Sequence, residues 1–273
     1  MIPDENNTIR IAILTEYDGT DFVGFQRQNN GRSVQQVLED ALAVLYGRPV
    51  LIYGCSRTDS GVHARGHVSH INVPFNIPSE KLPLAMNAIL PEDVSIRAAA
   101  LVTSGFHARF HSLGKEYVYR IWNSPVRTSI DRRSVAHVPG HLDLCAMQEA
   151  ASQLEGEHDF SAFCAQTGKY VNPVRNMESI RVAARDDSPM IEIIVRGKSF
   201  LYNMVRILAG TIVYAGQGKL DPSEISTILT SQDRRLSGKT MPAKGLTLEK
   251  VYYDPDPFGM SIYISDKKSH NLM

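Results

Sequence analysis

Residues 53–68 read Y-G-C-S-R-T-D-S-G-V-H-A-R-G-H-V, and this stretch carries more chemical information than any other part of the chain. An apolar run ends at Tyr53 and a strand-like run begins near Val68, which predicts a loop between two strands. Three glycines allow the loop to turn sharply and to approach a ligand closely. Asp59 is the single carboxylate among several cations, so it is expected to stay ionised. The loop therefore suits one anionic nucleophile, with a simple Asx-turn at Asp59 as the alternative.

The composition is that of an ordinary globular protein. Its 273 residues are enough for a substantial core, arranged as one large domain or as two close halves. Three cysteines without C-x-x-C spacing predict neither a disulfide framework nor a zinc site, and they favour a reducing, cytoplasmic environment. The polar and acidic start predicts no signal peptide, and no apolar run is long enough to span a membrane.

The distribution of charge is more informative than its sum. The formal net charge is zero, which argues against a nonspecific binder of polyanions. Basic residues nevertheless gather in residues 57–70, 107–133 and 234–250, and acidic residues gather in 143–159 and 221–224. This segregation favours one basic face and one acidic face, although ordinary solvated surface gives the same pattern.

Three further segments combine a regular pattern with polar residues. Residues 17–28 read Y-D-G-T-D-F-V-G-F-Q-R-Q, an aromatic loop that can stack on unpaired bases or can be held together by its own apolar side chains. Residues 115–120 read K-E-Y-V-Y-R and alternate as a strand does, and such an aromatic row is more often core than binding site. Residues 241–253 read M-P-A-K-G-L-T-L-E-K-V-Y-Y and have the pattern of a core strand in their second half.

A charged residue interrupts an apolar segment near the end of the chain. Residues 199–216 read S-F-L-Y-N-M-V-R-I-L-A-G-T-I-V-Y-A-G, a mostly apolar helix with Arg206 near its middle. A buried guanidinium cannot lose its proton, so it needs a carboxylate or a phosphate partner. An arginine on a solvent-exposed edge of the helix needs no such partner, and this is the alternative interpretation.

These motifs, in this order, resemble those of the tRNA pseudouridine synthase A family over roughly residues 10–253. R-T-D-S-G-V-H-A is similar to the family's active-site motif, and residues 17–28 are similar to its Y-D-G-x-x-F-x-G-x-Q-x-Q segment. The remaining matches are K-x-Y-x-Y at 115–119, G-x-H-D-F-x-x-F at 156–163, F-L-x-x-M-V-R at 200–206 and A-P-x-x-G-L-x-L-x-x-V-x-Y at 241–253. Met241 stands where the family usually has alanine, which is a mild departure.

The resemblance implies a role for each residue that matches a family motif. Asp59 is expected to be the nucleophile, which attacks either C6 of the uracil or C1′ of the ribose. Tyr117 is expected to stack on the target base, and Leu246 to close the uracil pocket. Arg206 is expected to pair with Asp59, which would lower the pKa of that carboxyl by roughly 1–3 units. Arg57, beside the nucleophile, is a candidate to fill the space that the flipped base leaves.

Further RNA contacts are expected at basic residues near these motifs. The candidates are Arg27, His63, Arg65, Arg109 and Lys115. The H-x-x-x-H spacing at 63–67 suits zinc only on a helix, and the glycine and the strand pattern there oppose a helix. No H-E-x-x-H motif and no deaminase signature is present, so we expect no metal.

The resemblance also implies a fold and partners. We expect an α+β pseudouridine synthase fold, with a central, mostly antiparallel sheet from two similar halves, flanking helices and a basic cleft. Residues 1–110 would form the half with the Asp59 loop, and residues 111–273 the half with Tyr117, Arg206 and Leu246. The expected substrate is uridine at positions 38–40 of the tRNA anticodon arm, bound by a homodimer. The isomerisation moves no electrons or groups in or out, so no cofactor is needed.

Two other classes of function fit parts of the sequence. One is a protein that binds or refolds tRNA without chemistry, for which Asp59 would be dispensable. The other is a metal-dependent nucleic-acid hydrolase that uses the histidines of residues 63–70, and it predicts that a chelator abolishes activity.

Overall fold

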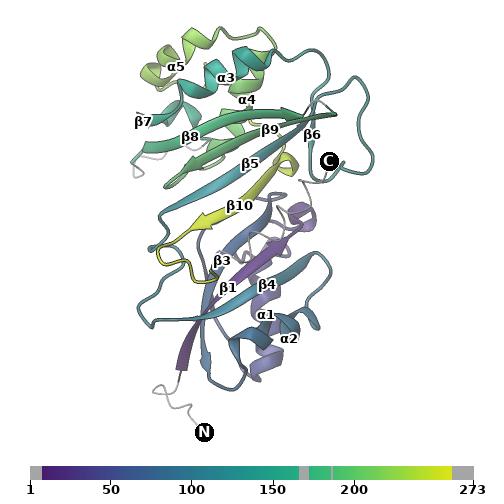
Figure 1. The fold of residues 1–273 in the computed structure, drawn as a ribbon, viewed down its shortest axis with the longest axis vertical. Helices are drawn as coiled ribbons and strands as arrows, with labels where there is room; N and C mark the ends of the chain where they lie inside the picture. The colour runs from purple at the N-terminus through teal and green to yellow at the C-terminus, as the bar shows by residue number, and fades with distance from the viewer. Residues whose placement is uncertain (1–7, 166–171, 186, 260–273) are drawn as a thin grey trace. The chain divides into compact units, whose positions relative to one another are not determined.

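The computed structural model describes residues 8–165, 172–185 and 187–259, and every structural statement below refers to these residues. They form ten strands and five α-helices, joined by loops and short 3-10 turns (Figure 1). The expected α+β class is confirmed. Contacts within the chain define two compact units: the first unit comprises residues 8–60, 64–113 and 251–259, and the second comprises 61–63 and 114–250.

The first unit is built on three long antiparallel strands. They are β1 (Thr8–Tyr17), β3 (His63–Pro74) and β4 (Val94–Val102), and the first residue of β3, His63, belongs to the second unit. β1 lies between the other two, with Ile11 opposite both Ile71 of β3 and Leu101 of β4. The short strand β2 (Ile52–Gly54) pairs with the other side of β3. The loop with Asp59 therefore joins two strands, as the sequence predicts.

Two helices complete the first unit. Helix α1 (Val34–Tyr46) begins after Ser33, whose hydroxyl accepts from the Gln36 amide, and it ends at Gly47 with a positive φ of 65°. The sequence predicts a helix over residues 79–90, before Pro91, and helix α2 (Leu82–Asn87) is shorter than this. It ends early because the Asn87 side chain bonds both the N–H and the C=O of Ile96 in β4.

The second unit contains a sheet in the order β10–β5–β9–β8–β7, and β6 pairs with β5. β5 pairs antiparallel with β9, β9 with β8, and β8 with β7. The bounds are β5 (Gly114–Trp122), β6 (Ala136–His137), β7 (Gly156–Asp159), β8 (Val174–Arg185), β9 (Ser188–Gly197) and β10 (Leu246–Tyr252). Residues 179–185 and 190–195 have the sequence pattern of two strands, and β8 and β9 confirm both.

Three helices, α3 (Leu144–Ser152), α4 (Met204–Gly216) and α5 (Ile225–Ser231), lie together beside the strands of the second unit (Figure 1). α3 and α4 approach so closely that a Cβ on Gly216 would lie 2.5 Å from the Met147 side chain. α4 begins later than predicted, because Asn203 adopts a left-handed conformation at its N-terminus. Along the described ranges, none of the helices combines the length and the apolar character that crossing a bilayer requires.

Candidate active site

The loop around Asp59 is ordered by contacts with the end of β1 and the loop after it. Asp59 is half-buried and lies on the loop that joins β2 to β3. The Phe25 amide donates to the Thr58 carbonyl at 3.1 Å, and the hydroxyls of Tyr17 and Thr58 lie 2.8 Å apart. Ser60, on the other side of the acid, donates its hydroxyl to a backbone carbonyl at 3.1 Å. The residues before and after Asp59 are thus fixed by one neighbouring segment of the first unit.

Close backbone packing makes glycine necessary at position 24. Gly24 has a φ of +118°, and a Cβ there would lie 2.7 Å from the Thr58 carbonyl oxygen. Real Cβ atoms essentially never approach that closely, and few residues other than glycine adopt this backbone conformation. Residues 17–28 therefore support the Asp59 loop, and Phe22 and Phe25 are buried.

The histidine His67 belongs to the packing under the loop. Its ring stacks on Phe25 with a centroid distance of 4.0 Å. His67 Nε2 lies 3.1 Å from the Ser56 carbonyl oxygen, so this nitrogen carries the proton, and Nδ1 accepts from Ser69. Across the described ranges of the chain, no group of three or more His, Cys, Asp or Glu side chains is placed to hold a metal ion.

The predicted RNA-contacting cations of the first unit lie at its surface. Arg57 and Arg65, on either side of Asp59 in sequence, are exposed. Arg27 forms an ion pair of 3.0 Å with Glu39 on α1. Arg109 is exposed, and its guanidinium lies 5.9 Å from the centre of the Phe110 ring.

The predicted base-stacking residue lies on a central strand of the second unit. Tyr117 on β5 is only 6% exposed and stands opposite Val195 of β9. The edge of one ring meets the face of the other between Tyr117 and Phe200, with centroids 5.1 Å apart. Lys115 on the same strand is 8% exposed. Leu246, the first residue of β10, is buried.

The guanidinium of Arg206 is oriented by two contacts within the second unit. Its Nε donates to the Met241 carbonyl at 2.7 Å, and its Nη1 donates to the Asn203 side chain at 2.9 Å. The Met241 amide in turn donates to the Arg206 carbonyl. A guanidinium is planar with N–H groups in fixed directions, so two contacts define its orientation. The half-buried side chain is thus held against the start of segment 241–245.

Tyr119 holds the next residue of that segment. Its hydroxyl donates to the Pro242 carbonyl at 2.8 Å, and its ring leaves no room for a side chain at Gly245. Burial raises the pKa of the Tyr119 phenol well above its ordinary value, although the positive charge of Arg206 acts in the opposite direction. The phenol therefore keeps its proton and remains a donor. The sequence marked Tyr119 as part of an aromatic row but gave no indication of this contact.

His63 holds the end of the same segment. The ring is 8% exposed, and Nε2 lies 2.9 Å from the Arg133 carbonyl oxygen and 3.2 Å from the Lys244 carbonyl oxygen. Both oxygens are acceptors, so Nε2 carries a proton. His63 was predicted to contact RNA, and the structure places this nitrogen against the backbone of its own unit.

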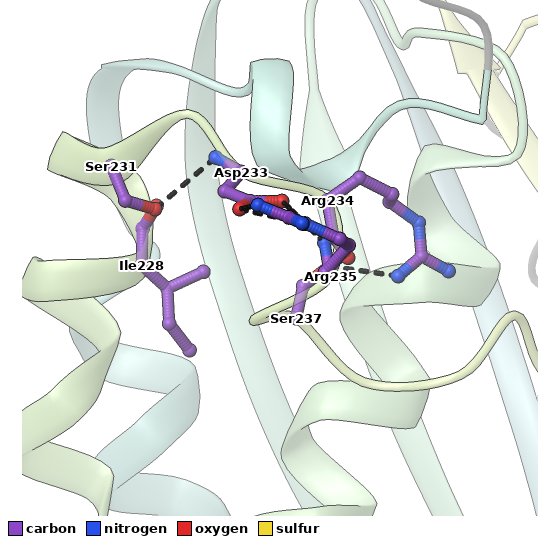
Figure 2. Close-up of polar contacts among 6 residues, drawn as sticks. All are labelled: Ile228, Ser231, Asp233, Arg234, Arg235 and Ser237. Carbon is purple, nitrogen blue, oxygen red and sulfur yellow. Dashed lines mark hydrogen bonds and ion pairs between the residues drawn. The ribbon is translucent and has the colours of Figure 1, made fainter.

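The loop before segment 241–245 is also ordered. Arg234 donates to the Ser237 hydroxyl at 2.9 Å, and Arg235 is paired with Asp233 at 2.5 Å; both contacts are drawn in Figure 2. A Cβ on Gly210 of α4 would lie 1.9 Å from the Lys239 carbonyl oxygen, so the loop lies directly against the helix. Segment 241–245 and Leu246 therefore follow a loop of fixed shape.

Comparison with known proteins identifies the family. Residues 13–111 and 150–254 match the family described as tRNA pseudouridine synthase. The chain belongs to this family. It is 46% identical over 244 residues to tRNA pseudouridine synthase A of Ruminiclostridium cellulolyticum, covering 89% of this chain and 99% of that relative. The protein of the same name from Geobacillus kaustophilus is 43% identical over 250 residues, covering 91% and 96%, and that from Bacillus subtilis is 40% identical over 248 residues, covering 90% and 100%.

The comparisons confirm the family that the motifs indicate. As a tRNA pseudouridine synthase, the chain is an isomerase with tRNA as its substrate. The reaction breaks the N1–C1′ bond of a uridine and rejoins the uracil to the ribose through C5, so the atoms of substrate and product are the same. Asp59 lies in the first unit, and Tyr117, Arg206 and Leu246 lie in the second. The ion pair between Asp59 and Arg206 stays a prediction.

Proposed function

We propose that the enzyme isomerises uridine at positions 38–40 of the tRNA anticodon arm, with Asp59 as its nucleophile. The observation that supports this role most strongly is the motif R-T-D-S-G-V-H-A on an ordered loop with Asp59 half-buried. A nucleophile must be ionised and held within reach of its target carbon. Attack on C6 and attack on C1′ are both compatible with this arrangement.

Arg206 is proposed to keep Asp59 ionised. An arginine beside a carboxylate lowers the carboxyl pKa by about 1–3 units, which leaves the acid anionic at neutral pH. Asn203 and the Met241 carbonyl orient the guanidinium in advance, so little side-chain freedom is lost when it meets an anion. This orientation supports a role for Arg206 in the site.

Tyr117 and Leu246 are proposed to receive the flipped base. Taking a base out of a paired stem costs a few kcal/mol, which contacts in the pocket must offset. The Tyr117 ring is fixed by Phe200, so a uracil would stack on a side chain that is already ordered. Arg57 is exposed beside the nucleophile and is proposed to fill the vacated place in the stem.

The assembly and location of the enzyme are part of the proposal. The resemblance supports a homodimer that binds one tRNA across both subunits, and a cytoplasmic location follows from its substrate and from the low cysteine content. The reaction is proposed to proceed without a cofactor, because no electrons or groups are exchanged.

The test compares Asp59→Asn with the wild type on an unmodified tRNA. Asparagine keeps the shape of the side chain and removes the negative oxygen. Mass-tagged detection should show no pseudouridine with Asp59→Asn, while tRNA affinity stays within about threefold. Asp40→Asn changes an exposed acid on α1 and serves as the matched control with wild-type product. Wild-type product from Asp59→Asn would exclude this nucleophile, and product outside positions 38–40 would exclude the proposed target.

A further inference from the structure

Two loops of the second unit meet at His63, and both carry cations. One nitrogen, His63 Nε2, lies within hydrogen-bonding distance of the carbonyls of Arg133 and Lys244. A second link runs in parallel, because Lys244 Nζ donates to the Arg132 carbonyl at 3.0 Å. The backbones of residues 132–133 and 244 are therefore held side by side.

The hydrogen bonds that build this junction leave the charges of Arg132 and Lys244 in place. The Arg132 guanidinium donates to the Ser129 carbonyl, and the Lys244 ammonium donates to the Arg132 carbonyl. Both acceptors are neutral, so the two contacts order the side chains without cancelling their charge. Asp131, the acid of this loop, contacts Thr128. The side chains of Arg132 and Arg133 are exposed, which leaves them accessible to a ligand.

The junction is close in sequence to both halves of the candidate site. Three residues separate His63 from Asp59, a length of chain that spans at most about 14 Å. Lys244 stands two residues before Leu246. A ligand group held at this junction would therefore lie within a short distance of the reacting nucleotide.

The chemistry of the junction matches that of a phosphate. Guanidinium groups bind phosphate oxygens in pairs, and an ammonium supplies a compact point charge. In complexes of proteins with nucleic acids, contacts to phosphates fix the position of the strand, and other contacts read the bases. We propose that Arg132, Arg133 and Lys244 form a phosphate-binding cluster that holds the tRNA backbone beside the target uridine.

This proposal adds a binding site to the proposed function and rests on it only for the location of the uridine. It also adds residues to Arg109 and Lys115, for which the sequence predicts RNA contacts. Lys115 is 8% exposed, whereas Arg132 and Arg133, like Arg109, are exposed. The cluster has a second property that isolated surface cations lack, namely a shared scaffold in His63.

The test measures tRNA affinity as a function of salt concentration for Arg132→Gln, Lys244→Gln and the double variant. Glutamine keeps a hydrogen-bonding side chain but removes the charge. Each single variant should bind tRNA about three- to tenfold more weakly and should lower the slope of log K against log salt by about 1. The single-turnover rate at saturating tRNA should change less than the affinity does. Lys244→Arg keeps the charge and should restore both affinity and slope.

Arg235→Gln is the matched control. Arg235 is an exposed arginine of the same unit, but it is paired with Asp233 (Figure 2), and it lowers the pKa of that carboxyl to about 2. Its loss should leave affinity and slope unchanged. Wild-type affinity and slope in the double variant would overturn the cluster, and so would a loss of saturated rate with normal affinity. Asp59→Asn should change the reaction rate but not the slope of log K against log salt. The rate therefore tests Asp59 as the nucleophile, and the slope tests the phosphate-binding cluster.

Discussion

The two units hold their parts of the candidate site by different means. In the first unit, Asp59 lies on a loop that packs against another loop, backbone against backbone, with Gly24 at the closest approach. In the second unit, the side chains of Arg206, Tyr119 and His63 each reach a different carbonyl of segment 241–245. The first arrangement has no room for an added atom. The second depends on individual hydrogen bonds from side chains, so the two units should respond differently to substitution.

The largest effect is expected from Gly24→Ala in the first unit. The added methyl group would lie 2.7 Å from the Thr58 carbonyl oxygen, so the backbone on which Asp59 stands must move. A misplacement of about 1 Å costs on the order of 100-fold in rate, and we expect a loss of at least that size. Single-turnover formation of pseudouridine measures it. Gly105→Ala is the control, because a Cβ there meets nothing within 4 Å, and it should react at the wild-type rate. Equal rates for the two variants would contradict close packing at Gly24.

A smaller effect is expected from His63 in the second unit. His63→Met removes the N–H donor to the Arg133 and Lys244 carbonyls, whereas His63→Gln keeps a donor at a similar reach. One net hydrogen bond contributes about 1 kcal/mol, so the methionine variant should react about fivefold more slowly. The glutamine variant should stay within about threefold of the wild type. Identical rates for the two variants, measured on the same tRNA, would show that the ring matters only for packing.

The smallest effect on the reaction rate is expected from substitution of His70 in the first unit. This substitution should instead change how the free energy of unfolding depends on pH. His70 is 2% exposed, and its Nδ1 accepts from the Ala108 amide. Burial, with help from the charges of His107 and Arg10, lowers the pKa of the His70 imidazole from 6.5 to about 4. The unfolded chain therefore binds a proton as the pH falls below about 6.5, while the folded chain stays neutral until about 4. The free energy of unfolding should therefore decrease by about 1–3 kcal/mol as the pH falls from about 6.5 to about 4.

Urea unfolding at pH 7.5 and at pH 5 tests this expectation. His70→Asn keeps an acceptor for the Ala108 amide and does not titrate, so its stability should change less between the two pH values. His141→Asn removes an exposed histidine and should leave the wild-type difference in place. Equal pH dependence in His70→Asn and the wild type would exclude His70 as the source.

Features that depend on neighbouring residues were predicted well from the sequence. Ser33, with Gln36 three residues on, and Asp221, followed by Pro222 and Glu224, have the sequence pattern of helix starts, and both accept from amides within three residues of themselves. The loop with Asp59 was placed correctly between two strands because apolar runs flank it on both sides. In each case the residues that decide the structure lie within a few positions of one another.

Features that depend on distant residues were not predicted. Tyr119 contacts Pro242, 123 residues away, and His63 contacts Lys244, 181 residues away. No local pattern contains such a pair, so His63 was assigned to RNA contact and Tyr119 to an aromatic row. The start of α4 was misplaced for a related reason. Asn203 adopts a left-handed conformation and bonds the Arg206 guanidinium, which propensity alone does not indicate.

The path of the chain through the units has a consequence for synthesis on the ribosome. The first unit takes its last described segment, residues 251–259, from the C-terminal end of the chain. Tyr252 accepts from the Leu113 amide, and the Tyr253 hydroxyl donates to the Ala108 carbonyl. A nascent chain that has emerged only as far as residue 250 lacks these contacts, although it already contains Asp59. We therefore expect the N-terminal region to reach its final structure late in translation, after the second unit has been synthesised.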